Sequence, residues 1–260
     1  MNSEEYLEWF DTHKDNCSAN HQGSSGKMEV DAIREIFERS VPSYGVKYLN
    51  YIGDGDSRTY KGVVDASLYG SSVEISKKEC VEQVQKRMGT WLHACKKKIK
   101  GLGGRGKLTG KLIDELTVYY DLTIRRNSDF VEKIKDAIWA TIFHKSSTDE
   151  EPKHDKCPPG QESWCSWQRA KATDSLKNYN HRTPLHSDVV GAIRPIYESL
   201  TEKKLLQRCF GGFTQNSNES LIWRIAPEGH HSGAAIFKIA ANIAACTFNE
   251  GAKTLMMIMK

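Results

Sequence analysis

The sequence has no uninterrupted apolar run of the roughly 18 residues that a membrane-spanning helix needs. Its most apolar stretch, residues 234–248, is interrupted by Lys238 and Asn242. The first residues, MNSEEYLEWFDTHKD, are acidic and aromatic, whereas a secretory signal begins with basic residues followed by an apolar segment. We therefore expect a protein with no secretory signal and no membrane partner.

Cysteine is scarce, and its count of seven is odd. The cysteines lack the regular spacing of a small disulfide-bonded domain, so we expect a reducing compartment with thiols free or bound to metal. Cys95, Cys209 and Cys246 lie on apolar faces of predicted helices and are expected in the core. Cys17 and His21, with three residues between them, form a weak candidate metal pair.

Acidic residues are missing from one long stretch. The formal net charge of +4 is only mildly basic and says little about partners, but residues 86–111 contain no Asp or Glu and nine basic residues. These are Lys86, Arg87, Lys96, Lys97, Lys98, Lys100, Arg105, Lys107 and Lys111. Such a stretch favours a polyanion, because neutralising phosphates releases counterions. The alternative is a solvated helix face. We predict that the stretch binds DNA without sequence preference.

No phosphate-binding loop and no internal repeat are found. The segment KGLGGRGK at residues 100–107 is basic and rich in glycine. It lacks both the preceding apolar strand and the Gly-x4-Gly-Lys-Ser/Thr spacing of a P-loop. We expect a flexible connection between helices.

Strand patterns occur early in the sequence, and helical patterns follow. A β-branched and aromatic run at residues 46–52 predicts a buried strand that ends in turn residues, and residues 73–75 predict a second strand. Residues 144–168, rich in Pro, His, Cys and Trp, are expected to be irregular. Apolar residues at helical spacing and local sequence predict helices at residues 28–39, 58–68, 79–100, 108–122, 128–143, 187–209, 217–225 and 234–250.

Acidic residues stand at the ends of two predicted elements. Asp54 and Asp56 follow the first strand, where a rigidly held carboxylate can face Mg²⁺, a cation that binds one or two carboxylates together with waters and phosphates. Our hypothesis is that Glu219, at the start of a predicted helix, faces the same cation. Ordinary explanations also exist, since Asp-Gly-Asp is a good turn sequence and an acid in the first turn suits the helix dipole.

Several segments of the chain resemble the Mutator-like transposase family. They are CSANHQGSSGKME, YIGDGDSRTY, VQKRMGT, KGLGGRGKLTGKL, HDKCPPGQESWCSW and FNEG. The order of a strand with Asp-Gly-Asp-Ser, then VEISKKEC opening a helix, then a long helical stretch and TQNSNES is similar as well. The resemblance extends over nearly all of the chain.

The resemblance implies a DDE transposase with an RNase H-like sheet and an all-helical insertion. In such enzymes one Asp lies on the first strand, a second Asp follows a later strand, and a Glu lies on a helix after the insertion. Asp54 is then the second acid and Glu219 the third. Asp56 is a weaker candidate, because it lies two residues beyond the strand end. The implied cofactor is Mg²⁺, since two metals held by carboxylates activate water and stabilise the leaving 3′ oxygen.

The chain departs from the family pattern in three places. The family's first Asp lies on a strand upstream of the residues present here, and no strand-borne Asp precedes residue 46. Relatives carry Cys-x2-His after the second Asp, whereas Cys80 is followed by Gln83. The helix that follows Glu219 is also shorter before Trp223. We therefore expect little or no independent catalysis.

Two His and two Cys occur in one polar segment of the predicted insertion. They are His144, His154, Cys157 and Cys165. This donor set suits tetrahedral zinc, although the spacing matches no standard zinc finger. The alternative is a loop anchored by burial of Trp164 and Trp167, with the cysteines packed as small apolar residues.

The sequence thus predicts an α/β protein, mostly helical, with a partial RNase H-like core and a large all-helical insertion. Residues 1–89 are expected to form the later part of the core, and residues 90–210 the insertion, with a zinc-binding loop at 144–168. Residues 211–260 are expected to return to the core and to contain the helix that carries the third acid, Glu219. We expect a nuclear, transposase-derived protein that binds DNA and is catalytically inactive. The alternatives are a host-used, non-enzymatic DNA- or chromatin-binding module, and a zinc-stabilised helical interaction protein, which the basic stretch disfavours. Homo-oligomerisation is left open.

Overall fold

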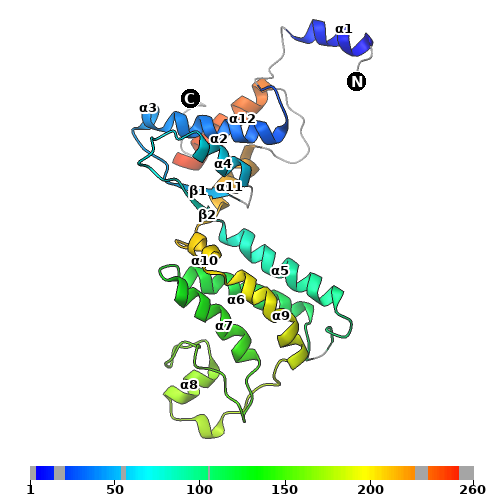
Figure 1. Cartoon of the computed structure of the whole chain (residues 1–260), viewed down its shortest axis with the longest axis vertical. Coiled ribbons are helices and arrows are strands. Elements are labelled where there is room, and N and C mark those ends of the chain that lie inside the picture. The colour runs from blue at the N-terminus through cyan, green and yellow to red at the C-terminus, as the bar shows by residue number, and fades with distance from the viewer. Residues whose placement is uncertain (1–3, 15–20, 54–56, 105, 226–233, 252–260) are drawn as a thin grey trace. The chain divides into compact units, whose positions relative to one another are not determined.

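The chain is mostly helical, with one small sheet (Figure 1). The computed structural model describes residues 4–14, 21–53, 57–104, 106–225 and 234–251. The elements are α1 (Glu4–His13), α2 (Ser25–Glu38), α3 (Ser40–Tyr44), β1 (Asn50–Gly53), α4 (Ser57–Asp65), β2 (Ser76–Glu79), α5 (Val81–Lys98), α6 (Gly110–Arg126), α7 (Val131–Lys145), α8 (Ser166–Ala172), the 3₁₀ turn η2 (Leu176–Asn178), α9 (Ser187–Leu200), α10 (Lys203–Cys209), α11 (Asn216–Ile225) and α12 (Ala234–Glu250). The predicted mostly helical class is confirmed.

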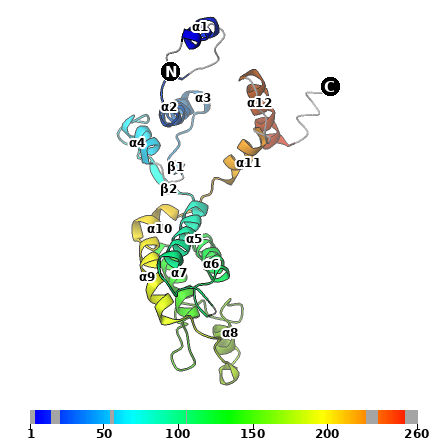
Figure 2. The ribbon, with the colours of Figure 1, turned by 90° about the vertical axis from the view of Figure 1, so that its right-hand side faces the viewer.

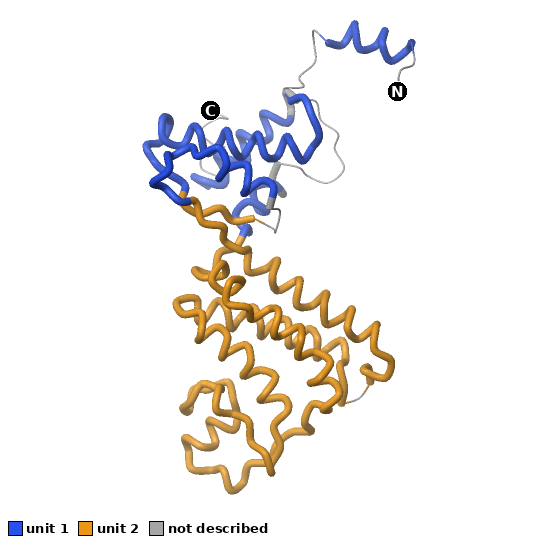
Figure 3. The backbone as a smooth tube through the Cα atoms, in the orientation of Figure 1, with its two compact units in different colours: residues 1–48, 57–74, 215–260 blue, residues 49–56, 75–214 orange. Residues whose placement is uncertain are grey.

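The chain divides into two compact units (Figure 3). One contains residues 1–48, 57–74 and 215–260, and the other contains residues 49–56 and 75–214. We refer to the second as the helical unit, because it holds α5 to α10. The predicted three-part division at residues 89 and 210 stays a prediction.

The sheet consists of β1 and β2, which pair in parallel. Asn50 lies opposite Ser76, and Gly53 lies opposite Glu79. Both strands begin a few residues later than predicted, and β1 is only partly buried, because β-branched and aromatic residues favour an extended chain without determining where backbone pairing starts. Ile75, for example, is buried but lies just before β2. An RNase H-like core stays a prediction.

The core of the helical unit is formed by amphipathic helices that pack side by side (Figure 2). Each helix buries residues three or four positions apart, which lie on one face. On α5 these are Val81, Val84, Met88 and Leu92; on α6 Ile113, Leu116, Tyr120 and Ile124; on α7 Ile134, Ile138 and Ile142; on α9 Val189, Ile193, Tyr197 and Leu200. The Tyr120 hydroxyl donates to the Leu200 carbonyl at 2.9 Å, so the buried polar atom is satisfied.

The structure differs from the predicted elements at four helices. The single helix expected at residues 187–209 is two, since α9 ends at Leu200 and the buried Thr201 hydroxyl bonds to the Tyr197 carbonyl at 2.7 Å. Helices α1, α3 and α8 were not predicted. All three are short, and α8 begins inside the segment that was expected to be irregular, residues 144–168, but ends beyond it. Of the described helices, none is both long and apolar enough to span a membrane.

Candidate metal centre and basic surface

The structure brings the four predicted metal ligands of the helical unit together. His144 lies in the last turn of α7, His154 and Cys157 lie in the following loop, and Cys165 is the residue before α8. One ligand atom from each residue lies within 4.8 Å of all the others. His154, Cys157 and Cys165 are buried, and His144 is partly buried. We call these four residues the His₂Cys₂ group.

The distances within the His₂Cys₂ group match the edges of a tetrahedron around zinc. Bond lengths of about 2.0–2.1 Å to nitrogen and 2.3 Å to sulfur place two nitrogens about 3.3 Å apart and a nitrogen and a sulfur about 3.6 Å apart. The two histidine Nδ1 atoms are 3.3 Å apart. Cys165 Sγ is 3.4 Å from each Nδ1, and Cys157 Sγ is 4.0 Å from His144 and 3.8 Å from His154. The arrangement is therefore close to that of a tetrahedral metal site, with Cys157 Sγ a few tenths of an ångström farther from the two nitrogens than a zinc ion would require.

Short local contacts set the positions of these ligands. The Cys157 amide donates to the His154 carbonyl at 3.0 Å, a turn that places both side chains on one side. From α8, the buried Gln168 amide donates to the His154 carbonyl at 2.8 Å. The Cys165 amide donates to the Ser163 hydroxyl at 3.1 Å. The loop is thus held to α8 by its backbone, and its side chains remain available for a ligand.

Two tryptophans pack against the histidines of the group, Trp167 stacked on His154 and Trp164 edge-on to His144. The Trp167 ring lies 4.9 Å from the His154 ring and nearly parallel to it, and the Trp164 ring lies 5.0 Å from His144. Trp164 is 38% exposed, so it does not anchor the loop by full burial. The tryptophans therefore pack around the metal ligands, and their burial does not by itself account for the position of the loop.

The electrostatic environment favours the metal-binding protonation states of His154 and Cys165, whereas a hydrogen bond to Cys165 and burial raise the pKa of Cys157. Burial lowers the pKa of His154, so its ring is neutral at neutral pH. A hydrogen bond from the Cys157 thiol lowers the pKa of Cys165, and His144 lowers it further. A thiolate and a neutral imidazole are the forms that coordinate metal. By contrast, burial raises the pKa of Cys209 to about 12, as expected for a core thiol.

Three residues that sequence analysis did not select lie next to the His₂Cys₂ group. Ser147, Asp149 and His181 form hydrogen bonds that lead to the His154 ring. His181 is 27 residues from His154 in sequence, and the segment between them carries no regular pattern that would have connected the two. Only the folded loop shows that they are neighbours.

The predicted basic stretch covers the end of α5, the following glycine-rich loop and the start of α6. Lys86, Lys97, Lys98, Lys100 and Lys111 are exposed, and Arg105 lies outside the described residues. Within the described part of the chain, no ion pair involves these five lysines or the partly buried Lys96, and only Arg87 among the described basic residues of the stretch forms one. Lys107 donates to the Gly101 carbonyl at 2.7 Å, which holds the loop. The lysine charges are therefore free for a polyanion.

Arg87 has a partner inside the protein. Its guanidinium lies 3.7 Å from the carboxylate of Glu79, a buried residue at the end of β2. Arg208 of α10 lies 3.5 Å from the same carboxylate. A buried charge needs such compensation, so the two arginines connect β2 to α5 and α10. Arg87 therefore has a structural partner in addition to its predicted contact with DNA.

The predicted acidic site is described only in part. Asp54 and Asp56 lie outside the described residues. Glu219 is exposed in the first turn of α11, where its amide donates to the Gln215 carbonyl at 3.0 Å. Of the weaker pair, Cys17 lies outside the described residues, and His21 pairs with Asp31 at 3.0 Å. The acidic site stays a prediction.

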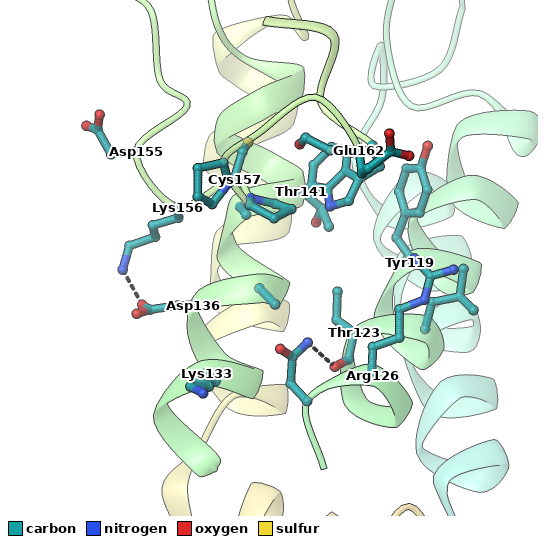
Figure 4. A pocket seen from close by; sticks show the side chains of 18 residues that line it. Tyr119, Thr123, Arg126, Lys133, Asp136, Thr141, Asp155, Lys156, Cys157 and Glu162 are labelled. Atoms are coloured by element: carbon teal, nitrogen blue, oxygen red, sulfur yellow. Dashed lines mark hydrogen bonds and ion pairs between the residues drawn. The ribbon is translucent and has the colours of Figure 1, made fainter. Parts of the chain in front are cut away.

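A cavity of about 820 Å³ lies between α6, α7 and the loop of the His₂Cys₂ group (Figure 4). Tyr119 and Arg126 line it from α6, and Cys157 lines it from the loop. Lys156 and Asp136 form an ion pair at its edge (Figure 4). Three basic side chains (Arg126, Lys133 and Lys156) and three acidic ones (Asp136, Asp155 and Glu162) line the cavity, so it does not select a ligand of one charge.

The fold and the site thus define a mostly helical protein whose helical unit contains a His₂Cys₂ group able to hold a metal ion. A family model described as Mutator-like transposase matches residues 3–165. Because the match covers more than half of the chain, the protein belongs to the Mutator-like transposase family. All members of the His₂Cys₂ group lie inside the matched range, whereas Glu219 lies beyond it. No curated protein and no solved structure matches the chain.

Proposed function

We propose that the protein is a transposase-derived DNA-binding protein whose helical unit is stabilised by a structural zinc ion. The observation that supports the metal site best is the set of distances within the His₂Cys₂ group, which are those of a tetrahedral centre. Four protein ligands complete the coordination of zinc and leave no open position for a substrate. The zinc is therefore structural and not catalytic.

The donor set selects zinc over harder cations. Two nitrogens and two sulfurs in a tetrahedral arrangement suit zinc, while Mg²⁺ and Ca²⁺ prefer oxygen ligands. Residues 146–165 also contain no Val, Ile, Leu, Met or Phe, so this segment has little apolar surface with which to order itself. Metal binding supplies the missing stabilisation, with about 10–16 kcal/mol apparent in small zinc sites.

The purified protein is expected to contain about one equivalent of zinc per chain. Elemental analysis of protein prepared without a metal-affinity step measures this directly. A zinc-free protein in which residues 146–165 still resist protease would contradict the proposal, and would leave the tryptophan contacts as the explanation for the ordered loop. Bound magnesium or calcium in place of zinc would also contradict it.

The exposed lysines of the basic stretch support DNA binding. Lys97, Lys98 and Lys100 occur together at the end of α5 and in the following loop, Lys86 lies earlier on α5 and Lys111 at the start of α6, and no acid is present between residues 86 and 111. Such a surface neutralises phosphates without reading bases, so binding independent of sequence is proposed. With a DNA partner, the proposed location is the nucleus. Membership of the Mutator-like transposase family also supports DNA as the partner.

Family membership also supports a carboxylate site for Mg²⁺, with Asp54 as the principal ligand, Glu219 as the second and Asp56 as a weaker candidate. Asp54 directly follows the end of β1, and Glu219 is exposed at the start of α11, so both donors come from the ends of elements. Their oxygens suit Mg²⁺, which would supply charge stabilisation at a phosphodiester. We propose that this site no longer cleaves DNA, because Gln83 stands where relatives carry His.

No strand cleavage is expected when the protein is incubated with duplex DNA and Mg²⁺ at concentrations where it binds. Product analysis on denaturing gels measures this. Cleavage that disappears in Asp54→Asn and Glu219→Gln variants would contradict the proposal and assign an active enzyme. The absence of cleavage together with retained DNA binding would support the non-enzymatic DNA- or chromatin-binding alternative.

A further inference from the structure

We infer that Asp149 and His181 are positioning residues of the metal centre, because they fix the tautomer and the orientation of His154. The inference deepens the proposed function and depends on its metal site. It concerns residues outside the His₂Cys₂ group, and follows from a continuous series of hydrogen bonds in the helical unit.

The series begins at the Asp149 carboxylate. Its Oδ1 lies 2.6 Å from His181 Nδ1 and 2.9 Å from the His181 backbone nitrogen. An ionised carboxylate can only accept hydrogen bonds, so the proton between the two side chains belongs to His181 Nδ1. In a neutral imidazole the other nitrogen, Nε2, then presents a lone pair.

His181 Nε2 in turn determines the state of His154. The two Nε2 atoms are 2.9 Å apart, and since His181 accepts, His154 Nε2 must donate. The lone pair of His154 is thereby placed on Nδ1. That atom lies 3.4 Å from Cys165 Sγ and 3.3 Å from His144 Nδ1, inside the His₂Cys₂ group. The series therefore presents the correct nitrogen to the metal.

Ser147 strengthens the same arrangement. Its hydroxyl oxygen lies 2.9 Å from His154 Nε2 and 3.1 Å from His181 Nε2, and it also accepts from the Lys153 amide at 2.8 Å. The hydroxyl can accept from His154 and donate to His181. These hydrogen bonds through Ser147 require the same tautomers of His154 and His181 as the direct contact between the two rings.

Burial makes the arrangement rigid. Ser147 and His154 are buried, and the His181 side chain is only 7% exposed. The His154 and His181 rings stack with centroids 5.1 Å apart and planes within 17°. Hydrogen-bonded partners behind a metal-bound histidine orient the ring and raise its basicity, and removing them typically lowers metal affinity by about 10–100-fold.

The experiment compares zinc affinity in the full chain by competition with a chromophoric chelator. His181→Phe is expected to bind zinc about 10–100-fold more weakly than the unchanged protein. Asp149→Asn is also expected to weaken zinc binding. Asp149 is exposed, so this substitution should not prevent folding, and it tests the inference even if His181→Phe does not fold. His181→Gln, whose side-chain oxygen can accept from His154, should restore part of the loss. Glu150→Gln and His93→Gln are the controls, since both residues are exposed and lie outside the series.

Cobalt substitution separates positioning from coordination. A tetrahedral two-nitrogen, two-sulfur cobalt spectrum should keep its form in every variant, since none of them removes a ligand. Affinities of His181→Phe and Asp149→Asn equal to those of the two controls would overturn the inference while leaving the zinc site in place. An unchanged protein that binds no zinc would overturn the proposed metal site and the inference with it.

Discussion

A Cys165→Ser variant is expected to purify with far less than one equivalent of zinc. Cys165 Sγ is the sulfur closest to both histidine nitrogens, at 3.4 Å from each, and the residue is fully buried. A serine hydroxyl does not ionise at neutral pH and is a poor zinc ligand, so the site keeps three donors at most. Elemental analysis and chelator competition measure the loss.

The expected loss of zinc affinity follows from the contribution of one ligand to the total free energy of zinc binding. If structural zinc contributes about 10–16 kcal/mol in total, one ligand in four corresponds to roughly 3–4 kcal/mol, or a factor of about 10²–10³ in affinity. The loop should become sensitive to protease between His144 and Cys165, because residues 146–165 have no aliphatic side chains to hold them. Helices α5, α6 and α9 should remain folded, since their core does not include the loop.

Cys209→Ser is the matched control for this experiment. Cys209 is as deeply buried as Cys165, but it packs in the core of the helical unit. Its replacement places a hydroxyl in an apolar site and costs stability, while the zinc content should stay at one equivalent. Equal zinc contents in the two variants would show that Cys165 is not a ligand.

Replacing Lys96, Lys97, Lys98 and Lys100 together by glutamine is expected to weaken DNA binding and to reduce its salt dependence. Each phosphate contact on duplex DNA contributes a slope of about 0.9 in the plot of log affinity against log salt, so four contacts account for a decrease of up to about 3.6. At low salt the loss of affinity should be at least about tenfold. Fluorescence anisotropy with a labelled duplex at several salt concentrations measures both quantities.

A variant with the same change of charge elsewhere serves as the control. Lys133, Lys135, Lys203 and Lys204 are exposed residues of α7 and α10, and their replacement by glutamine also removes four positive charges. This control should retain most of the affinity if the basic stretch is the DNA site. Equal losses in the two variants would show that only net charge matters. Binding that does not respond to salt would show that the stretch is a solvated helix face.

The sequence by itself determined most of the longer helices, the family and the composition of the metal centre. Helices with a continuous apolar face, such as α5 and α6, were predicted to within a few residues, because their buried positions repeat every three or four residues. The His₂Cys₂ group was predicted from residue type alone, since two His and two Cys occur within 22 consecutive polar and aromatic positions, residues 144–165. Metal ligands that lie close together in one segment can be predicted from the sequence alone.

The tertiary structure alone decided which residues support that chemistry. His181 contacts His154 across 27 residues of sequence, and Asp149 contacts His181 across 32. Their role depends on which ring nitrogen carries a proton. The ion pair between Glu79 and Arg208, 129 positions later, is likewise decided only by the tertiary structure. A sequence pattern reports how residues repeat along the chain. Hydrogen-bond direction and charge compensation depend on distances of about 3 Å between side chains, which exist only after the chain has folded.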